Sequence, residues 1–198
     1  MAEDRRTRRT RRALRDALVA LVMERGYAAL TVEDITERAD VARATFYSHC
    51  RDKDALFTRV TTDLLQELGE RLQPLADKSD TGFTGEPLLA LLHHAEEERD
   101  LYRVILRGEG DGKPLRMFTE EAVRRISAVF RRRAEQNHRE PRIDPEVIAR
   151  AWVGEHFAVM QWWLEGEEGR MPAEGLAELL LGLSRHGRYW ASGFDPAD

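Results

Sequence analysis

One short polar segment near the N-terminus carries the side chains whose chemistry is easiest to interpret. Arg43, Thr45, Tyr47 and His49 are polar, whereas Phe46 among them is apolar. On a short helix that buries Phe46, the polar side chains are expected to face outward, where they can donate and accept hydrogen bonds. Guanidinium groups and hydroxyls bind phosphates and the edges of nucleic-acid bases. The segment therefore predicts a surface for nucleic acid.

Two short helices joined by a turn are expected to position this surface. Thr31 precedes an apolar-periodic stretch and has Asp34 three residues on, which is the arrangement of a capping box and predicts a helix over 32–39. A turn over 40–42 leads to a second helix over 43–48. This is the size and order of a helix-turn-helix, whose second helix lies in the major groove of DNA. At Thr31, the hydroxyl and the free backbone N–H groups can hold a phosphate.

A preceding helix is expected to support the pair through a small apolar core. Its apolar residues recur at helical spacing, and Gly26 stands where a left-handed C-cap would end it. The expected core consists of Leu18, Val22, Ile35, Ala39, Val41 and Phe46.

Residues 30–57, LTVEDITERADVARATFYSHCRDKDALF, resemble the DNA-binding region of TetR-type (TetR/AcrR) transcriptional regulators. The resemblance is tight over about residues 8–60 and looser afterwards. The matching residues are Thr31, Ile35, Ala39, Val41, Thr45, Phe46, Tyr47, His49, Lys53 and Leu56. By resemblance, Arg43, Ala44 and Thr45 face the groove of double-stranded DNA. The residues expected to hold phosphates are Thr31, Tyr47, His49 and Lys53.

Four positions depart from the family's pattern. Asp40 stands where the turn usually has glycine, so a non-glycine residue is expected to adopt a positive φ. Ala42 and Asp52 both replace serine, and Cys50 replaces phenylalanine. We expect Asp52 to cap the next helix, Cys50 to be a small buried residue, and contact with the DNA backbone to be weaker. The arginine-rich N-terminal arm is expected to offset this by entering the minor groove.

Charge is distributed unevenly along the 198 residues, whose net charge is −5. The first 60 residues hold 13 Lys/Arg and 10 Asp/Glu, and seven arginines lie in the first 15. A basic end on an acidic body indicates that one end meets a polyanion, although charge alone fits a solvated terminus equally well. One cysteine excludes a disulfide framework and a Cys-cluster zinc site. With no long apolar run, we expect a soluble, cytoplasmic protein without a membrane segment.

The whole chain shows helical periodicity and few strand signals, which predicts an all-α fold of about nine helices. We expect a helix-turn-helix domain over 1–52 and a helical ligand-binding and dimerisation domain over 53–198. A fourth helix is expected to start after Asp52 and to end or kink at Pro74. Asp144 is expected to cap a later helix that has Pro145 at its first position.

Two roles for the second domain follow from the resemblance together with apolar stripes. The family dimerises through its last two helices, and here the residues expected at a homodimer interface are Trp152, Val159, Trp163, Leu176, Leu180 and Leu183. The family also encloses a ligand cavity, which implies a small apolar or aromatic ligand. The candidate lining is Leu64, Leu68, Leu92, His93, Tyr102, Ile105, Met117, Phe118, Ile126 and Phe130. Each stripe is equally compatible with an ordinary helical core.

Catalytic motifs and cofactor sites are not expected. The glycine-rich stretch GEGDGKP lacks the first glycine and the Ser/Thr of a phosphate-binding loop. His93 and Glu97 share a helix face but lack the spacing of a zinc protease motif, so a charged exposed face is favoured over a metal site. The leading hypothesis is a ligand-responsive repressor. Two alternatives are an activator or co-regulator acting through a protein partner, and a helical small-molecule-binding protein or enzyme.

Overall fold

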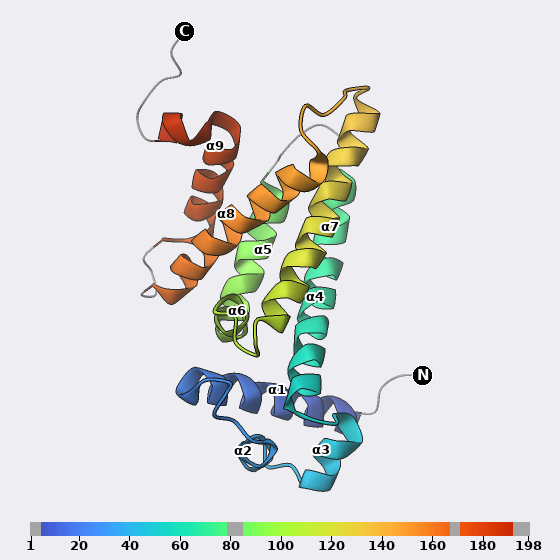
Figure 1. Cartoon of the computed structure of the whole chain (residues 1–198), viewed down its shortest axis with the longest axis vertical. Helices are drawn as coiled ribbons and strands as arrows, with labels where there is room; N and C mark the ends of the chain where they lie inside the picture. The colour runs from blue at the N-terminus through green and yellow to red at the C-terminus, as the bar shows by residue number, and fades with distance from the viewer. Residues whose placement is uncertain (1–4, 79–84, 167–170, 192–198) are drawn as a thin grey trace. The chain divides into compact units, whose positions relative to one another are not determined.

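The computed structural model describes residues 5–78, 85–166 and 171–191. Over these residues the chain forms nine α-helices and no strand, which confirms the all-α prediction (Figure 1). The helices are α1 (Arg5–Arg25), α2 (Val32–Arg38), α3 (Arg43–His49), α4 (Lys53–Lys78), α5 (Glu86–Glu97), α6 (Arg99–Leu106), α7 (Lys113–Gln136), α8 (Pro145–Glu165) and α9 (Ala173–Ala191).

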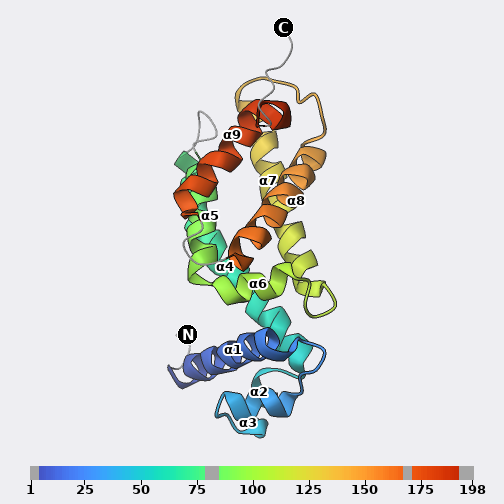
Figure 2. The same ribbon diagram turned by 90° about the vertical axis from the view of Figure 1, so that its left-hand side faces the viewer.

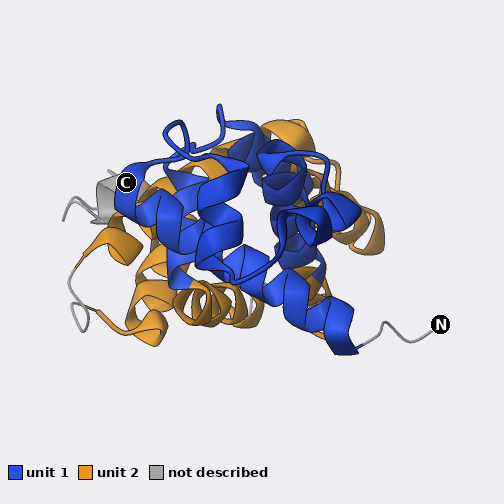
Figure 3. Ribbon diagram, turned by 90° about the horizontal axis from the view of Figure 1, so that it is seen from below, with its two compact units in different colours: residues 1–66, 99–121 blue, residues 67–98, 122–198 orange. Residues whose placement is uncertain are grey.

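One compact unit comprises residues 1–66 and 99–121 (Figure 3). In it, α2 packs on α1 and α3, and α6 also packs on α1 (Figure 2). Leu18, Ile35 and Phe46 are buried completely between these helices, as the sequence predicts. We call α1, α2, α3 and the first turns of α4 the head.

Local sequence signals explain how the head is shaped. Gly26 has φ 76° and ends α1, its N–H donating to the carbonyl of Val22 at 2.9 Å. Thr31 and Asp34 form the expected reciprocal capping box at the start of α2. Asp40 has φ 50°, so the turn keeps its left-handed shape without glycine. The departure at this position is thus accommodated by a residue type that tolerates this region.

The fourth helix begins as predicted and ends later than predicted. Asp52 accepts a hydrogen bond from the N–H of Ala55 at 2.6 Å, as an N-cap does. Of the two predicted outcomes at Pro74, an end of the helix is wrong, because α4 continues to Lys78, and a kink there stays a prediction. Proline has a φ that suits a helix and leaves only one carbonyl, four residues earlier, without its helical N–H partner. The loop predicted over 77–87 lies mostly outside the described residues.

The second compact unit comprises residues 67–98 and 122–198. Here α5 packs on both α8 and α9. The last turns of α4 are joined to α5 by an ion pair between Arg71 and Glu97, 2.5 Å apart. Asp144 caps α8 by accepting from the N–H of Glu146 at 2.8 Å, as predicted.

The two compact units do not coincide with the functional division at residues 52 and 53, because α4 and α7 each contribute to both units. That domain boundary stays a prediction. None of the described helices is long and apolar enough to cross a bilayer.

Candidate nucleic-acid interface

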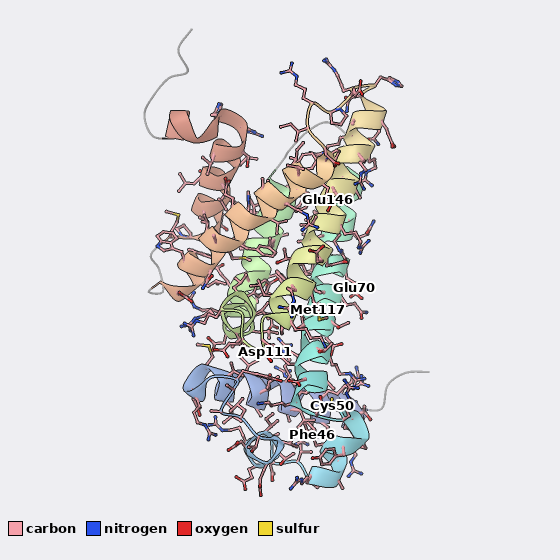
Figure 4. The ribbon with its side chains drawn as sticks, viewed as in Figure 1. Phe46, Cys50, Glu70, Asp111, Met117 and Glu146 are labelled. Atoms are coloured by element: carbon pink, nitrogen blue, oxygen red, sulfur yellow. The ribbon has the colours of Figure 1, made fainter. Side chains whose placement is uncertain are left out.

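Helix α3 presents a polar face outward over an apolar anchor. Phe46, labelled in Figure 4, is buried, and it packs edge-to-face against Tyr47 with their ring centroids 5.5 Å apart. Tyr47 is 48% exposed, and Arg43 and Ala44 are exposed as well. Thr45 is half-buried. The helix therefore offers a guanidinium and a phenol to a partner while its own position is fixed from beneath.

Arg43 and Tyr47 lie one turn apart and contact each other. The guanidinium carbon is 5.9 Å from the centroid of the Tyr47 ring. A hydrogen bond to Tyr47, followed by electrostatic attraction, holds the pKa of Arg43 above its usual value, so this side chain stays charged. Because the phenolic oxygen accepts from Arg43, its own hydrogen remains to donate to a phosphate. The pair thus places two donors side by side on an exposed face.

At the start of α2, the Thr31 hydroxyl is already committed within the chain. It donates to Asp34 Oδ2 at 2.6 Å and accepts from the Asp34 N–H at 3.2 Å. The bonds from Thr31, together with Arg25 at 3.3 Å, hold the pKa of Asp34 below its usual value. A phosphate at this end of α2 would therefore compete with a carboxylate, and the role predicted for Thr31 stays a prediction.

Lys53 is placed inward, against the corner between α1 and α2. Its Nζ donates to the carbonyls of Tyr27 at 3.0 Å and Leu30 at 2.8 Å, and lies 4.5 Å from the Tyr27 ring centroid. An ammonium has three N–H bonds, so one is left after these two. The structure assigns Lys53 an internal role, and a phosphate contact through the third N–H stays a prediction.

The C-terminal end of α3 is held by a residue that sequence reasoning did not single out. Arg59 Nη1, from α4, donates to the carbonyl of His49 at 3.2 Å. Cys50, labelled in Figure 4, follows His49 in the chain, is buried as predicted, and has a thiol pKa that burial raises. His49 itself is half-buried. Arg59 follows the motif by several residues, so no local spacing signal marks it.

The arginine-rich segment belongs to α1 from Arg5 onward. Its arginines are therefore presented from a helix, and entry of this segment into a minor groove stays a prediction. Two basic side chains of the head are offset by acids, since Arg38 pairs with Glu24 at 2.6 Å and Arg25 pairs with Asp34. A third pair joins Arg12 to Asp16 on α1 at 3.8 Å, and Arg43 on α3 is exposed.

The residues predicted to line a ligand cavity divide between the two compact units. In the first unit, Tyr102 and Phe118 pack edge-to-face with centroids 5.4 Å apart. In the second, His93 bonds to Glu174 on α9 at 3.0 Å and is partly exposed. The buried members are Leu64, Leu68, Leu92, Tyr102, Ile105 and Phe118, and the half-buried ones are His93, Met117, Ile126 and Phe130. Their convergence on one cavity stays a prediction.

The residues predicted at a dimer interface are mostly packed within their own chain. Trp163 is buried, and its Nε1 donates to the carbonyl of Met171 at 2.8 Å. Leu176 and Leu180 on α9 are buried too, whereas Trp152, Val159 and Leu183 are half-buried. Contact of these six residues with a second copy stays a prediction.

Metal-ligand clusters are absent from the part of the chain that the structure describes, where no group of three or more His, Cys, Asp and Glu side chains could hold an ion. His93 and Glu97, which share a helix face, are each bound to another partner, Glu174 and Arg71 respectively.

Buried His156 predicts a pH dependence of stability. It lies on α8, stacks on Trp152 with centroids 3.6 Å apart, and bonds through Nδ1 to the Trp152 carbonyl at 2.8 Å, so Nδ1 carries the proton. Burial lowers its pKa from 6.5 to about 4. Between these values the unfolded chain binds a proton that the folded chain does not, so stability falls as pH drops from 6.5 to 4. The expected loss is about 2–3 kcal/mol.

The measurement is urea unfolding across this pH range. His156→Phe keeps the stack on Trp152 and removes the titration, so its stability should fall less steeply with acid. His138→Asn is the control, because His138 is exposed and asparagine tolerates its φ of 50°. Equal pH slopes in wild type and His156→Phe would contradict the assignment.

Comparison with known protein families matches both parts of the chain. Residues 14–60 match the model for bacterial regulatory proteins of the tetR family. Residues 85–185 match a transcriptional regulator C-terminal region. The HTH-type transcriptional regulator YxbF of Bacillus subtilis, described as uncharacterized, is 44% identical over 91 residues, which are 45% of this chain and 24% of that protein. The chain thus spans about a quarter of the length of that relative.

Solved structures share the fold over nearly the whole chain. A TetR-family regulator from Syntrophomonas wolfei superposes with a TM-score of 0.79 over 97% of this chain and 100% of that one, at 15% identity. The fatty acid degradation regulator FadR from Bacillus halodurans gives 0.73 over 92% and 96%, at 14% identity. A TetR regulator from Streptococcus agalactiae is 26% identical, with a TM-score of 0.63 over 91% and 96%.

These matches fall on the elements whose geometry is described above. The tetR-family model covers most of α1, all of α2 and α3, and the first turns of α4. The matched families and relatives are regulators of transcription and not enzymes. A DNA-binding regulator of the helix-turn-helix type needs a second helix that exposes polar side chains and a first helix that holds it in place. Here α3 exposes the polar side chains, and α2 is capped at its start and packs on α3. The chain is a member of the TetR family of bacterial DNA-binding transcriptional regulators.

Proposed function

We propose that the protein is a cytoplasmic homodimeric repressor that binds a near-palindromic operator and is released by a small ligand. The observation that carries the proposal is the α3 face, where Arg43 and Tyr47 are exposed above buried Phe46. One short recognition helix reads only a few base pairs, so specificity needs two half-sites related by the two-fold axis of a dimer.

The dimer is proposed to form through an exposed apolar stripe on α8. The stripe comprises Val147, Ala151, Gly154, Ala158 and Trp162, all exposed at spacings of three and four residues. Val147 is 56% and Trp162 46% exposed, and a side chain added at Gly154 would meet nothing within 4 Å. Small residues between two large ones allow another helix to approach closely, which favours a second copy as the partner.

Leu179 on α9 supports the same proposal, because it is a leucine left 59% exposed in a regulator whose family dimerises through its last helices. Three of the residues predicted for this role from the sequence are buried within their own chain, namely Trp163, Leu176 and Leu180. Their side chains therefore pack inside each monomer. The proposed stripe therefore lies on a different face of α8 from the residues that were predicted from the sequence.

Release by a ligand is proposed from the apolar interior of the chain. A ligand lowers DNA affinity only by binding more tightly to the conformation that does not bind DNA. Because the predicted lining is mainly apolar and aromatic, the proposed ligand is apolar or aromatic. By reciprocity, operator DNA must weaken ligand binding by the same factor, typically about 5- to 150-fold.

Selection of DNA from a random pool by the purified protein tests the proposal. The expected product is a near-palindrome with half-sites about one helical turn apart, bound less tightly as salt is raised. Selection of a single, non-repeated half-site would contradict the dimeric mode. Failure to select any sequence would favour a regulator that acts through a protein partner. Asp40 and Asp52 support that alternative, because they place acidic side chains close to the recognition helix.

A further inference from the structure

The loop between α6 and α7 has a backbone that only its glycine-rich sequence allows. Gly108, Gly110, Asp111 and Gly112 have φ values of 77°, 69°, 55° and 69°. Residues with side chains rarely adopt this region, so the sequence GEGDG fixes an unusual local shape. The loop resembles a phosphate-binding loop only superficially, and none of the residues predicted to contact DNA lies in it. Figure 4 labels Asp111 in this loop, which belongs to the same compact unit as the head.

Glu109 in this loop contacts the corner between α1 and α2. Its Oε2 accepts a hydrogen bond from the backbone N–H of Tyr27 at 2.9 Å. Tyr27 is 6% exposed, and the two residues are 82 positions apart in sequence. A carboxylate that accepts from a buried N–H forms a strong bond, and its removal leaves that N–H without a partner.

The opposite side of the corner is held by α4. Lys53 donates to the Tyr27 carbonyl, and the Tyr27 hydroxyl donates to Asp54. Burial and the bond to Asp54 raise the pKa of Tyr27, so its hydroxyl keeps its proton. The corner is therefore clamped between α4, which follows the recognition helix directly, and the α6–α7 loop.

Close packing between the loop and Phe57 couples the loop to this clamp. The Phe57 ring lies 5.3 Å from the Tyr27 ring, centroid to centroid. A Cβ at Gly110 would lie 2.9 Å from Phe57 Cδ1, which is closer than real contacts allow. The loop thus fits against Phe57 only because position 110 has no side chain, and α6 itself packs on α1. Movement of the loop must disturb the corner.

We propose that Glu109 is a positioning residue for DNA binding: it holds the Tyr27 corner and thereby sets the orientation of α2 and α3. Displacement of the α6–α7 loop breaks this bond and lowers operator affinity. The inference rests on the proposed function in one respect, namely that the chain binds an operator. It assigns a role to the GEGDG stretch and names the atoms through which that stretch acts on the head.

Two substitutions at residue 109 separate the bond from the charge. Glu109→Ala removes the acceptor, whereas Glu109→Gln keeps an acceptor oxygen and loses the same charge. With the selected operator, Glu109→Ala should lose about tenfold in affinity, and Glu109→Gln should stay within about threefold of wild type. Binding to random DNA should not differ between them. Glu96→Ala, an exposed acid on α5, is the control for the change in net charge.

The Tyr27 amide reports directly whether the bond to Glu109 exists in solution. In 15N-labelled protein, the Tyr27 N–H resonance should shift and exchange faster with solvent in Glu109→Ala, and much less in Glu109→Gln. An unchanged Tyr27 resonance in folded Glu109→Ala protein would overturn the proposal, because the bond would then not exist in solution.

A pair of glycine variants tests the loop without touching Glu109. Gly110→Ala and Gly108→Ala impose similar backbone strain, at φ 69° and 77°, but only position 110 clashes with Phe57, since nothing lies within 4 Å of a Cβ at 108. Gly110→Ala should therefore reproduce the loss of operator affinity and the Tyr27 shift of Glu109→Ala, and Gly108→Ala should show much less of both.

These experiments distinguish a failure of the role inferred for Glu109 from a failure of the proposed function. If wild type selects DNA and Glu109→Ala binds the operator equally well, the inference is overturned and the proposed function stands. If Gly108→Ala and Gly110→Ala lose operator affinity equally, strain and not the contact at Phe57 is responsible, and the coupling through the loop is overturned. If wild type selects no DNA, the proposed function fails, and the positioning role fails with it.

Discussion

Replacing Arg43 with alanine is expected to cost about 1–3 kcal/mol of operator affinity if its guanidinium bonds a guanine. The structure favours this role, because Arg43 is exposed in the first turn of α3 and remains charged beside Tyr47. The loss should concentrate on one base position in each half-site, and random DNA should be affected much less. Competition binding with operators altered one base pair at a time measures it.

Two further variants sharpen this prediction. Tyr47→Phe removes a phosphate donor and also the oxygen that accepts from Arg43, so it should weaken all DNA and should not be additive with Arg43→Ala. Arg51→Ala removes the same charge from an exposed residue just beyond α3, paired with Asp52 at 3.1 Å. It should reduce specific and random binding alike. An Arg43→Ala protein with the same profile as Arg51→Ala would show that Arg43 reads phosphate and not a base.

The Trp162→Asp variant is expected to be monomeric and to lose operator binding. Trp162 is a large side chain left 46% exposed at one end of the α8 stripe, and a charge there would be buried by a second copy. Loss of an aromatic anchor from an interface typically costs about 2–4 kcal/mol of association free energy, which corresponds to roughly 30- to 1000-fold in the dissociation constant. Light scattering over a concentration series measures it.

The neighbouring positions supply the controls. Trp163 is buried in its own chain, so Trp163→Asp should lower the unfolding temperature before any effect on dimerisation can be seen. Gly154→Ala should stabilise the folded chain by about 0.5–1 kcal/mol, because the residue is helical and unobstructed. Gly154→Leu should fold equally well but dissociate the dimer. A dimer unaffected by both Trp162→Asp and Gly154→Leu places the interface elsewhere.

Local chemistry in the sequence determined the head in some detail. The Thr31–Asp34 capping box, the left-handed Gly26 and the Asp52 cap all depend on residues within four positions of one another, whereas the positive φ of Asp40 was expected from the family resemblance. Interactions of this range need no contact with a distant segment, so together with the family resemblance they made the helix-turn-helix predictable from the sequence. Helical periodicity likewise determined the all-α class and most of the helix starts.

Pattern alone did not determine which apolar face is covered. On α8, the stripe through Trp152 and Trp163 and the stripe through Val147 and Trp162 both repeat every three to four residues. Only the folded chain, in which α8 packs on α5, shows that Trp163 is buried and Trp162 exposed. Periodicity predicts that a helix has an apolar face, but it does not predict which helix covers that face. The covering helix is determined by contacts between segments that are far apart in the sequence.

The tertiary structure alone decided the roles of the charged residues near the head. Lys53 matches a phosphate-contacting position, yet its ammonium reaches two carbonyls at the Tyr27 corner. Glu109 lies 82 residues from the N–H that it accepts, and Arg59 caps α3 from another helix. A long charged side chain bonds whatever unsatisfied backbone group folding brings within its reach. That partner is defined by position in space, and no spacing along the chain specifies it.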